Sequence, residues 1–331
     1  MTIRRLALLA GLLVTAALSA APAEAQVAGN PSASAFSASF REWMSLHQVP
    51  AASGAIMKEG RLVSTFGFGG MHAATPAPIA SLSKAITAIC VAHLVDAGRL
   101  SFTTPLGSVL ARTFARLGQP ADPRFRTITI EQLLMHRAGL AREPLRGPTE
   151  RDLTGRFIST LATPLTSDPG GAMVYSNIGY ITLGMVVEAV TGTDYERFCR
   201  EASLRPMQAS GTIDPQLRQR ASSGGWRVSA IDYARFIQVF EPGSAALGPL
   251  GRQWQEARTG NPAYGLGIRM RRTEQGLLLT HTGRLTRQIR SGSLVIKFPN
   301  GMTAVAIFSG DPLQGATADL RRRLETAGTG L

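Results

Sequence analysis

The chain has 331 residues, of which 44% are hydrophobic and 6% aromatic, and its formal net charge at pH 7 is +13. That length and apolar content are typical of a globular protein with one large domain or two closely packed halves. The arginines are dispersed and aromatic residues are few, which argues against a nucleic-acid-binding protein. We expect no nucleic acid partner and prefer a basic surface that faces an acidic cell envelope.

The N-terminus has the pattern of an export signal. Arg4 and Arg5 precede the apolar run LALLAGLLVTAAL, which is too short to span a bilayer comfortably, and AEA at 23–25 gives a small-x-small cleavage site. We predict a Sec-type signal peptide over residues 1–25, a periplasmic or secreted protein, and no stable membrane span after cleavage. Removal of Arg4, Arg5 and Glu24 leaves a mature charge of +12. A membrane anchor is the disfavoured alternative, because no later segment is long and apolar enough.

The predicted elements change in type along the chain. Residues 26–37 are small and polar and predict a flexible leader, and the alternation around KEGR predicts a hairpin of two strands. From Leu82 apolar residues recur at helical spacing. Helical patterns broken by glycine and proline turns fill residues 103–225. The segments GLLLTHTG, SGSLVIKFP and MTAVAIFSG then predict three strands, and ATADLRRRLE predicts a closing helix.

This order of elements predicts an α+β fold. The two ends of the chain must share one antiparallel sheet flanked by helices, with a helical subdomain of roughly 103–225 inserted between them. We place the whole functional domain at residues 38–327. The oligomeric state is left open.

The two cysteines, Cys90 and Cys199, form an even pair that can join in an oxidising compartment. Cys90 also falls on an apolar helical stripe, which is equally compatible with a buried free cysteine that acts as a small hydrophobic residue. The sequence leaves both interpretations open.

Ser81 and Lys84 are the first candidate reactive pair. Lys84 is one of only three lysines in an otherwise arginine-rich chain. Residues three apart on a helix are neighbours, and the apolar stripe from Leu82 points elsewhere, so we expect the hydroxyl and the amine to project side by side away from the core. A nucleophilic serine needs an adjacent base, which a lysine can supply when burial favours its neutral amine and an arginine cannot. A chance pairing is the alternative.

Two further motifs can supply the rest of a hydrolytic site. Tyr175 and Asn177, in VYSNIGYITLG, precede a helical run, and a phenol and an amide there can move a proton and orient a carbonyl. His281, Thr282 and Gly283 end a strand along which a substrate can lie. In isolation these residues are more typical of a half-buried aromatic, a helix cap and a strand histidine.

Taken together, SLSK, YSN and HTG resemble the serine β-lactamase and penicillin-binding protein superfamily. The nearer likeness is to the branch with a Tyr-x-Asn motif, which includes class C β-lactamases, D-Ala-D-Ala carboxypeptidases and family VIII esterases. The flanking segments LLMHRAGL, GGWRVSAIDYARF and YGLGIRM also look like those of this branch. The resemblance covers nearly all of the mature chain and implies a β-lactamase/transpeptidase-like fold.

The resemblance implies a role for each motif residue. Ser81 would be the acylated nucleophile, Lys84 its activating base and Tyr175 the proton-transfer partner, while Asn177 would hold Lys84 and the substrate. His281, Thr282 and Gly283 would bind substrate, and the backbone N–H groups of Ser81 and Arg284 would form the oxyanion hole. His136, in the family segment LLMHRAGL, is expected to be structural. No metal or organic cofactor is expected.

The chain departs from the family pattern at the third motif. Many β-lactamases have a lysine where this chain has His281, and a mostly neutral histidine argues against efficient β-lactam hydrolysis. Arg284, Arg287 and Arg290 follow, where the family usually has small residues. One of them can replace the missing cation, Arg284 can instead narrow the pocket, or all three are solvated edge charges.

We therefore expect an exported serine hydrolase that acts through an acyl-enzyme. Its small-molecule or peptidoglycan-derived substrate would be an ester or a peptide-like amide, as for an esterase or a D-Ala carboxypeptidase, with weak β-lactam hydrolysis as a further option. The alternative is a catalytically feeble penicillin- or peptidoglycan-binding protein of the same fold. A basic scaffold that never uses the serine is the least favoured interpretation, since it gives Lys84 no reason to be there.

Overall fold

The computed structural model of the chain describes residues 31–145, 151–258, 263–287, 289–310 and 315–329. The predicted signal peptide and residues 26–30 of the predicted leader lie outside these ranges. No helix in the described ranges has the length and apolar character needed to cross a bilayer.

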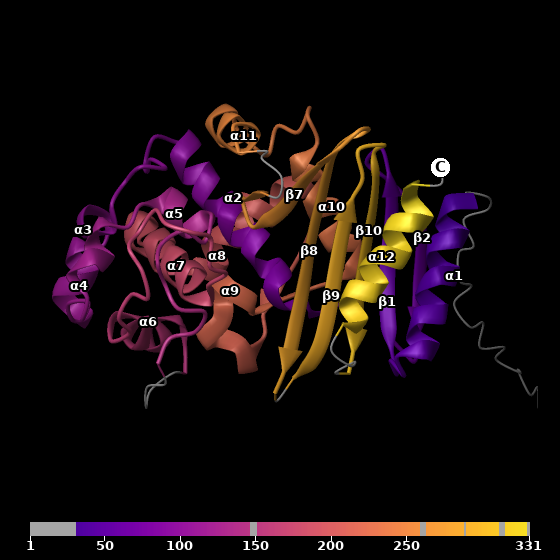
Figure 1. Cartoon of the computed structure of the whole chain (residues 1–331), viewed down its shortest axis with the longest axis horizontal. Helices are drawn as coiled ribbons and strands as arrows, with labels where there is room; N and C mark the ends of the chain where they lie inside the picture. Colours follow the sequence, from indigo (N-terminus) through magenta and orange to yellow (C-terminus); the bar gives the residue numbers. More distant parts are fainter. Residues whose placement is uncertain (1–30, 146–150, 259–262, 288, 311–314, 330–331) are drawn as a thin grey trace, which may run out of the picture.

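A seven-stranded antiparallel sheet organises the molecule, in the order β2-β1-β10-β9-β8-β7-β6 (Figure 1). The strands are β1 (Ala52–Lys58), β2 (Arg61–Phe68), β6 (Ala263–Gly265), β7 (Ile268–Thr273), β8 (Gly276–Thr286), β9 (Arg290–Lys297) and β10 (Met302–Ser309). β1 pairs with β10 in a register that places Ala55 opposite Val305. The prediction that both chain ends share one antiparallel sheet is therefore confirmed.

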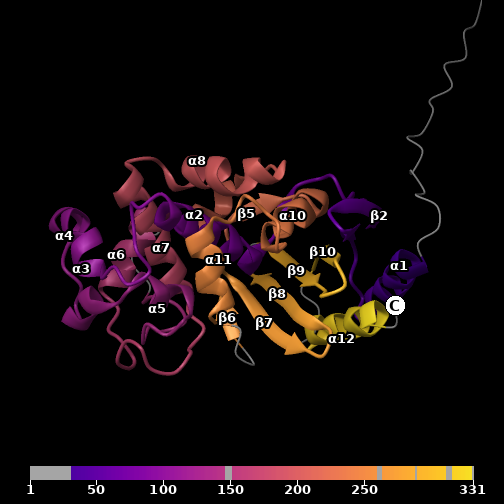
Figure 2. The ribbon, with the colours of Figure 1, turned by 90° about the horizontal axis from the view of Figure 1, so that it is seen from above.

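The outer face of the sheet is covered by α1 (Pro31–Leu46) and α12 (Ala316–Thr329), which lie side by side (Figure 2). Phe36 and Trp43 of α1 are buried there, and the Trp43 ring packs edge-on against Phe308 with 4.9 Å between centroids. The predicted flexible leader is thus wrong over residues 31–37, because Phe36 lies with Phe40 and Trp43 on one side of a helix that packs on the sheet.

The inner face packs against α10 (Ala230–Ile237) and against the turn η1 (Ala80–Leu82) that leads into α2 (Ser83–Asp96), and α11 (Pro249–Glu256) packs against α2. Residues on both faces of the sheet are buried: in β10, Val305 and Ile307 face inward while Ala306 and Phe308 face outward. Two separate apolar cores result, one on each side, which explains why the late strands are apolar at nearly every position.

Helix α2 lies between the sheet and the helical subdomain, as Figure 1 shows. Every residue from Ser83 to Ala92 is buried, including Lys84. The expectation of a one-sided apolar stripe, with Lys84 pointing away from the core, is therefore wrong. The alanines, valines and isoleucines of this helix pack on all sides because both halves of the molecule close around it.

The helical subdomain lies between α2 and β5 in the sequence and confirms the predicted α+β fold. Its helices are α3 (Leu106–Val109), α4 (Ala111–Leu117), α5 (Ile130–Leu134), α6 (Leu153–Leu161), α7 (Asn177–Thr191), α8 (Tyr195–Cys199) and α9 (Ala221–Gly224). Short helical segments complete the chain: η1 (Ala80–Leu82) before α2, then η2 (Pro123–Thr127), η3 (Arg200–Leu204), η4 (Arg205–Met207) and η5 (Pro215–Arg220) in the subdomain, and η6 (Gln238–Phe240) after β5. A small sheet of β3 (Ala77–Pro78), β5 (Trp226–Val228) and β4 (Thr212–Ile213) was not predicted.

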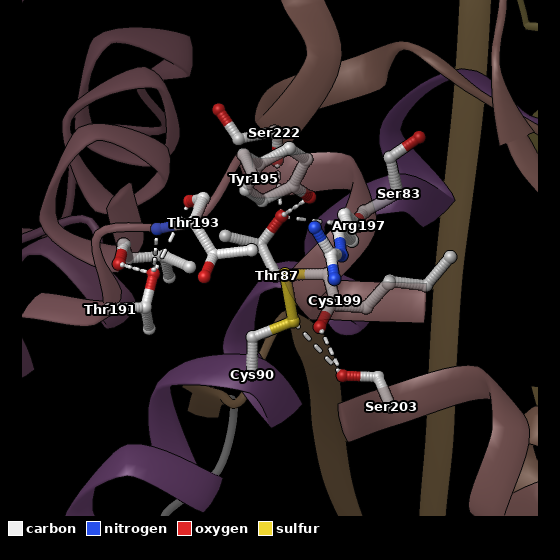
Figure 3. Close-up of a disulfide and its surroundings, with 12 residues drawn as sticks. Ser83, Thr87, Cys90, Thr191, Thr193, Tyr195, Arg197, Cys199, Ser203 and Ser222 are labelled. Atoms are coloured by element: carbon white, nitrogen blue, oxygen red, sulfur yellow. Dashed lines mark hydrogen bonds between the residues drawn. A yellow bond between two sulfur atoms is a disulfide. The ribbon is translucent and has the colours of Figure 1, made fainter. Parts of the chain in front are cut away.

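A disulfide between Cys90 and Cys199 ties α2 to the end of α8, across 109 residues of sequence (Figure 3). The bond lies beside a buried hydrogen bond of 2.6 Å between Thr87 Oγ1 and the Tyr195 hydroxyl. Tyr195 also accepts the indole N–H of Trp226 at 3.0 Å. The disulfide therefore reinforces a polar connection between the central helix and the subdomain.

We predict that the oxidised protein shows no free thiol when denatured, and that Cys90→Ala/Cys199→Ala lowers the free energy of unfolding. The cross-link closes a long loop in the unfolded chain, so its loss is expected to cost about 2–4 kcal/mol. Thiol titration in denaturant and urea unfolding of both proteins measure this. Two titratable thiols in the untreated wild type would contradict it.

Candidate active site

Ser81 lies in the turn η1, which leads directly into α2. Ala80 adopts a positive φ of 49°, a strained conformation for a residue with a side chain. The turn is held against the sheet because Ser293 Oγ of β9 donates to the Ile79 carbonyl at 2.6 Å. A Cβ at Gly283 of β8 would lie 2.6 Å from the same carbonyl oxygen. Gly283 thus lets the sheet approach the turn that presents Ser81.

Lys84 is completely buried and its amine reaches three oxygen atoms. Nζ lies 3.2 Å from Ser81 Oγ, 2.7 Å from Asn177 Oδ1 and 2.6 Å from the Ser223 carbonyl oxygen. A neutral amine has two N–H donors and one lone pair, so it can donate to Asn177 and Ser223 and still accept a proton from Ser81. The two fixed acceptors therefore point the lone pair at the serine.

The pKa of Lys84 is lowered from its usual value, chiefly because burial removes water from the charged form. Tyr175 and the carboxylate of Glu143 act in the opposite direction and raise this pKa, while Arg220 lowers it. Desolvation is the largest effect, so the site favours the neutral amine that a base requires.

Tyr175 lies on the loop just before α7, as predicted, and is half-buried. Lys84 Nζ lies 5.0 Å from the centre of its ring. The ring packs on His136, with 4.4 Å between centroids. His136 Nδ1 accepts the backbone N–H of Ser176 at 3.1 Å, and burial lowers the pKa of this histidine well below its usual value. His136 is thus a neutral support for the loop, in agreement with its expected structural role.

Asn177 begins α7, and its side chain connects Lys84 to a carboxylate that the sequence did not single out. Its Nδ2 donates to Glu143 Oε1 at 2.5 Å while its Oδ1 faces Lys84. Glu143 also contacts Arg156 at 3.0 Å and Arg220 at 3.2 Å. Partial burial raises the pKa of Glu143, but Arg220, Asn177 and Arg156 together outweigh it, so the pKa is lowered from its usual value. An ionised Glu143 can only accept hydrogen bonds, which fixes the orientation of the Asn177 amide.

No sequence signal pointed to Glu143, which lies in a loop without a helical or strand pattern. The connection becomes visible only in three dimensions, where the Asn177 backbone N–H donates to the Arg142 carbonyl at 2.8 Å and brings this loop beside α7.

His281 lies under the site and does not line its cleft. Its Nδ1 donates to the Thr282 carbonyl at 2.9 Å, so Nε2 accepts the Tyr264 hydroxyl at 3.0 Å. Burial, with Lys84 and Arg269 nearby, lowers the pKa of His281 to about 3. The histidine is therefore uncharged near neutral pH. The next residues, Thr282 and Arg284, alternate with it and are exposed.

A cleft of about 670 Å³ opens over Ser81. One wall is formed by the end of β8, from Arg284 to Thr286, together with Arg287 just after it, and the other by the loop around Glu143 and the segment before α9. The ladder between β7 and β8 ends at Thr280, so the following residues of β8 have one edge that β7 does not cover. An extended substrate can lie along that edge beside Ser81.

The structure thus brings the three predicted motifs together. Ser81, Lys84 and Asn177 are joined by direct contacts, Tyr175 stands over Lys84, and the Tyr175 and His281 rings lie 6.2 Å apart. Within the described part of the chain, no three His, Cys, Asp or Glu side chains gather as a metal-binding group.

A sequence model of the family described as Beta-lactamase matches residues 36–328. Penicillin-binding protein 4 of Amycolatopsis lactamdurans is 30% identical over 171 residues, which are 49% of this chain and 44% of that protein. Protein flp of Staphylococcus aureus (strain MW2) is 25% identical over 185 residues, 52% of this chain and 36% of that protein. The match spans less than half the length of each of these curated relatives.

Solved structures share the fold at lower identity. The β-lactamase/D-alanine carboxypeptidase from Pseudomonas syringae has a TM-score of 0.74 and 14% identity, over 90% of this chain and 99% of that one. SurE, solved with D-Leu, has a TM-score of 0.72 and 23% identity, over 90% of this chain and 76% of that one. The predicted resemblance to the β-lactamase and penicillin-binding protein superfamily is confirmed.

Substitution of one glycine next to the site tests how tightly α2 is packed. Gly267, between β6 and β7, has φ +77, and a Cβ there would lie 2.4 Å from the backbone of Ala85 on α2. Gly267→Ala is expected to lower the free energy of unfolding by about 3 kcal/mol or more, from backbone strain and overpacking. Urea unfolding measures this loss.

Gly192→Ala is the matched control, because Gly192 has φ +66 and nothing lies within 4 Å of its added Cβ. It is expected to cost only about 1–2 kcal/mol, for the strain alone. Equal losses in the two variants would show that α2 is not in tight contact with Gly267.

Proposed function

This chain belongs to the β-lactamase family, and on that premise we propose that it is an exported serine hydrolase acting through an acyl-enzyme. The observation that carries the proposal is the buried amine of Lys84, 3.2 Å from Ser81 Oγ, with a pKa that burial lowers. Enclosing a lysine costs free energy unless the neutral amine is used or its charge is paired. Here its strong contacts are with an amide oxygen and a backbone carbonyl oxygen.

In the proposed reaction, Lys84 Nζ takes the proton of Ser81 Oγ while Oγ bonds to the substrate carbonyl carbon. The carbonyl oxygen gains the electron pair and is stabilised by the backbone N–H groups of Ser81 and Arg284. The bond to the leaving group then breaks, and the proton passes from Lys84 through the Tyr175 hydroxyl to that group. Water attacks the acyl-enzyme by the same route, which releases the acid and restores Ser81.

The proposed substrates are esters and peptide-like amides, as for an esterase or a D-Ala carboxypeptidase. Support comes from His281, which is neutral and enclosed where many β-lactamases have a lysine cation. Efficient β-lactam hydrolysis is therefore disfavoured. The Pseudomonas syringae relative, described as a β-lactamase/D-alanine carboxypeptidase, shares the fold. The disulfide between Cys90 and Cys199 supports an oxidising compartment, as expected for the periplasm or the exterior.

The second candidate function is a feeble relative that binds a penicillin or peptidoglycan without turnover. Arg284 favours it, because this large residue lines the cleft together with Ser81. The two functions differ in whether an acyl-enzyme is released.

We predict that mature wild-type protein is labelled by a fluorophosphonate and cleaves 4-nitrophenyl esters, whereas Ser81→Ala does neither. Lys84→Ala should lower the rates by about 10²–10⁴-fold through loss of the base. Lys58→Ala is the control, since Lys58 lies on β1 with its amine on the Asn300 carbonyl. Unlabelled wild type would contradict the nucleophile, and a stable penicillin adduct without ester turnover would favour the binding protein.

The pH dependence tests the protonation state of Lys84. Since only its neutral form is a base, kcat/KM should fall as pH drops through the pKa of Lys84. The Glu143 carboxylate raises this pKa, so Glu143→Gln, which keeps an oxygen for Asn177 Nδ2, should move the acidic limb to lower pH. A profile measured with a 4-nitrophenyl ester checks the shift, and an acidic limb that stays in place or moves upward would refute it.

A further inference from the structure

The cleft over Ser81 has an unusual charge. Six of its lining residues are charged, and five of these are arginines: Arg142, Arg156, Arg220, Arg284 and Arg287. Glu143 is the single acid in the lining. A concave site lined by one sign of charge concentrates its field and attracts ligands of the opposite sign.

Internal pairing neutralises only part of this charge. Arg156 and Arg220 share the carboxylate of Glu143, at 3.0 Å and 3.2 Å. In the lining of the cleft, one acid thus faces these two guanidinium groups. The cluster lies beside Asn177, which Glu143 orients.

Two other arginines reach the cleft from its opposite walls. Arg142 lies on the subdomain wall, with its guanidinium 5.7 Å from the centre of the Tyr175 ring, and Arg287 lies on the opposite wall just after β8. Neither forms an ion pair with any carboxylate of the described residues. Both side chains are exposed, so their donors can turn toward a bound molecule.

We infer that this cleft selects acyl donors that carry anionic groups in addition to the reacting carbonyl. Arg142 and Arg287 are the residues that bind these anionic groups. The inference rests on the proposed acyl-enzyme reaction of the same site. Guanidinium groups bind carboxylates and phosphates through paired hydrogen bonds, so both chemistries fit. The neutral His281 supplies no such charge, so the arginines set the preference.

A graded series of 4-nitrophenyl esters tests the inference. The acyl groups are monomethyl glutarate, which is neutral, hydrogen glutarate, tricarballylate with two free carboxylates, and 4-phosphonobutanoate. We expect kcat/KM of wild type to rise with each negative charge, by about tenfold from the neutral to the doubly charged ester, and to fall back in 0.5 M salt. Comparing kcat/KM for the phosphonate ester with that for the tricarballylate ester shows whether the cleft prefers a phosphate-like group or carboxylates.

Single variants locate the effect. Arg142→Gln and Arg287→Gln should each lower the ratio of kcat/KM for the tricarballylate ester to that for the neutral ester by about threefold, since the two residues share the roughly tenfold preference. The ratio corrects for any general effect on the site. Arg61→Gln is the control: it removes one charge from β2, at the far edge of the sheet, and should leave the ratio unchanged.

A neutral ester that is cleaved as fast as the charged ones, or variants that keep the wild-type ratio, would overturn the inference and leave the hydrolase proposal standing. If no ester is cleaved, calorimetric titration of Ser81→Ala with tricarballylate, against valerate, gives the answer without turnover. If Ser81→Ala binds tricarballylate but not valerate, and the added change Arg142→Gln weakens that binding, the inference is supported. Failure to bind it in low salt refutes it.

Discussion

The contact between a buried, neutralised amine and a serine hydroxyl is the constraint on which the rest of the structure depends. Lys84 can keep its proton-accepting form because α2 is buried along its length and is enclosed by α7, α9, α11 and η3. The carbonyl of Ser223 and the amide of Asn177 accept its two N–H groups. Burial and geometry therefore act together. The packing that removes water from the Lys84 amine also orients its lone pair toward Ser81 Oγ.

The closeness of packing around α2 depends on positions where no side chain fits. Gly283 brings β8 against the turn before Ser81, and Gly267 brings the β6–β7 turn against the backbone that follows Lys84. The strained φ of Ala80 is held by the hydrogen bond from Ser293 to the preceding residue. Each of these contacts joins the sheet to the nucleophile, so the antiparallel sheet from both chain ends is part of the site as much as of the core.

Much of this was predictable from local pattern, and the failures have physical causes. Strand alternation, turn residues and the three motifs predicted the fold class and the residues that meet around Lys84. The same reasoning assigned α2 an exposed face, because periodicity describes one helix and does not report what closes over it. The prediction of a flexible leader was wrong because the segment has few apolar residues, yet a few such as Phe36 suffice to hold a helix on a sheet. Glu143 was missed because its role depends on a contact with Asn177, 34 residues away.

The charges of the cleft and the protonation of Lys84 are linked. Glu143 raises the pKa of Lys84 and Arg220 lowers it, so one arginine of the cleft, Arg220, also helps keep the amine neutral. A bound anion would act like Glu143 and favour the ammonium form. Guanidinium partners beside that anion offset this effect, because the paired charges largely cancel at the distance of Lys84. An arginine-lined cleft is therefore compatible with a neutral lysine base, whereas a cleft that held an anion without such partners would weaken its own catalyst.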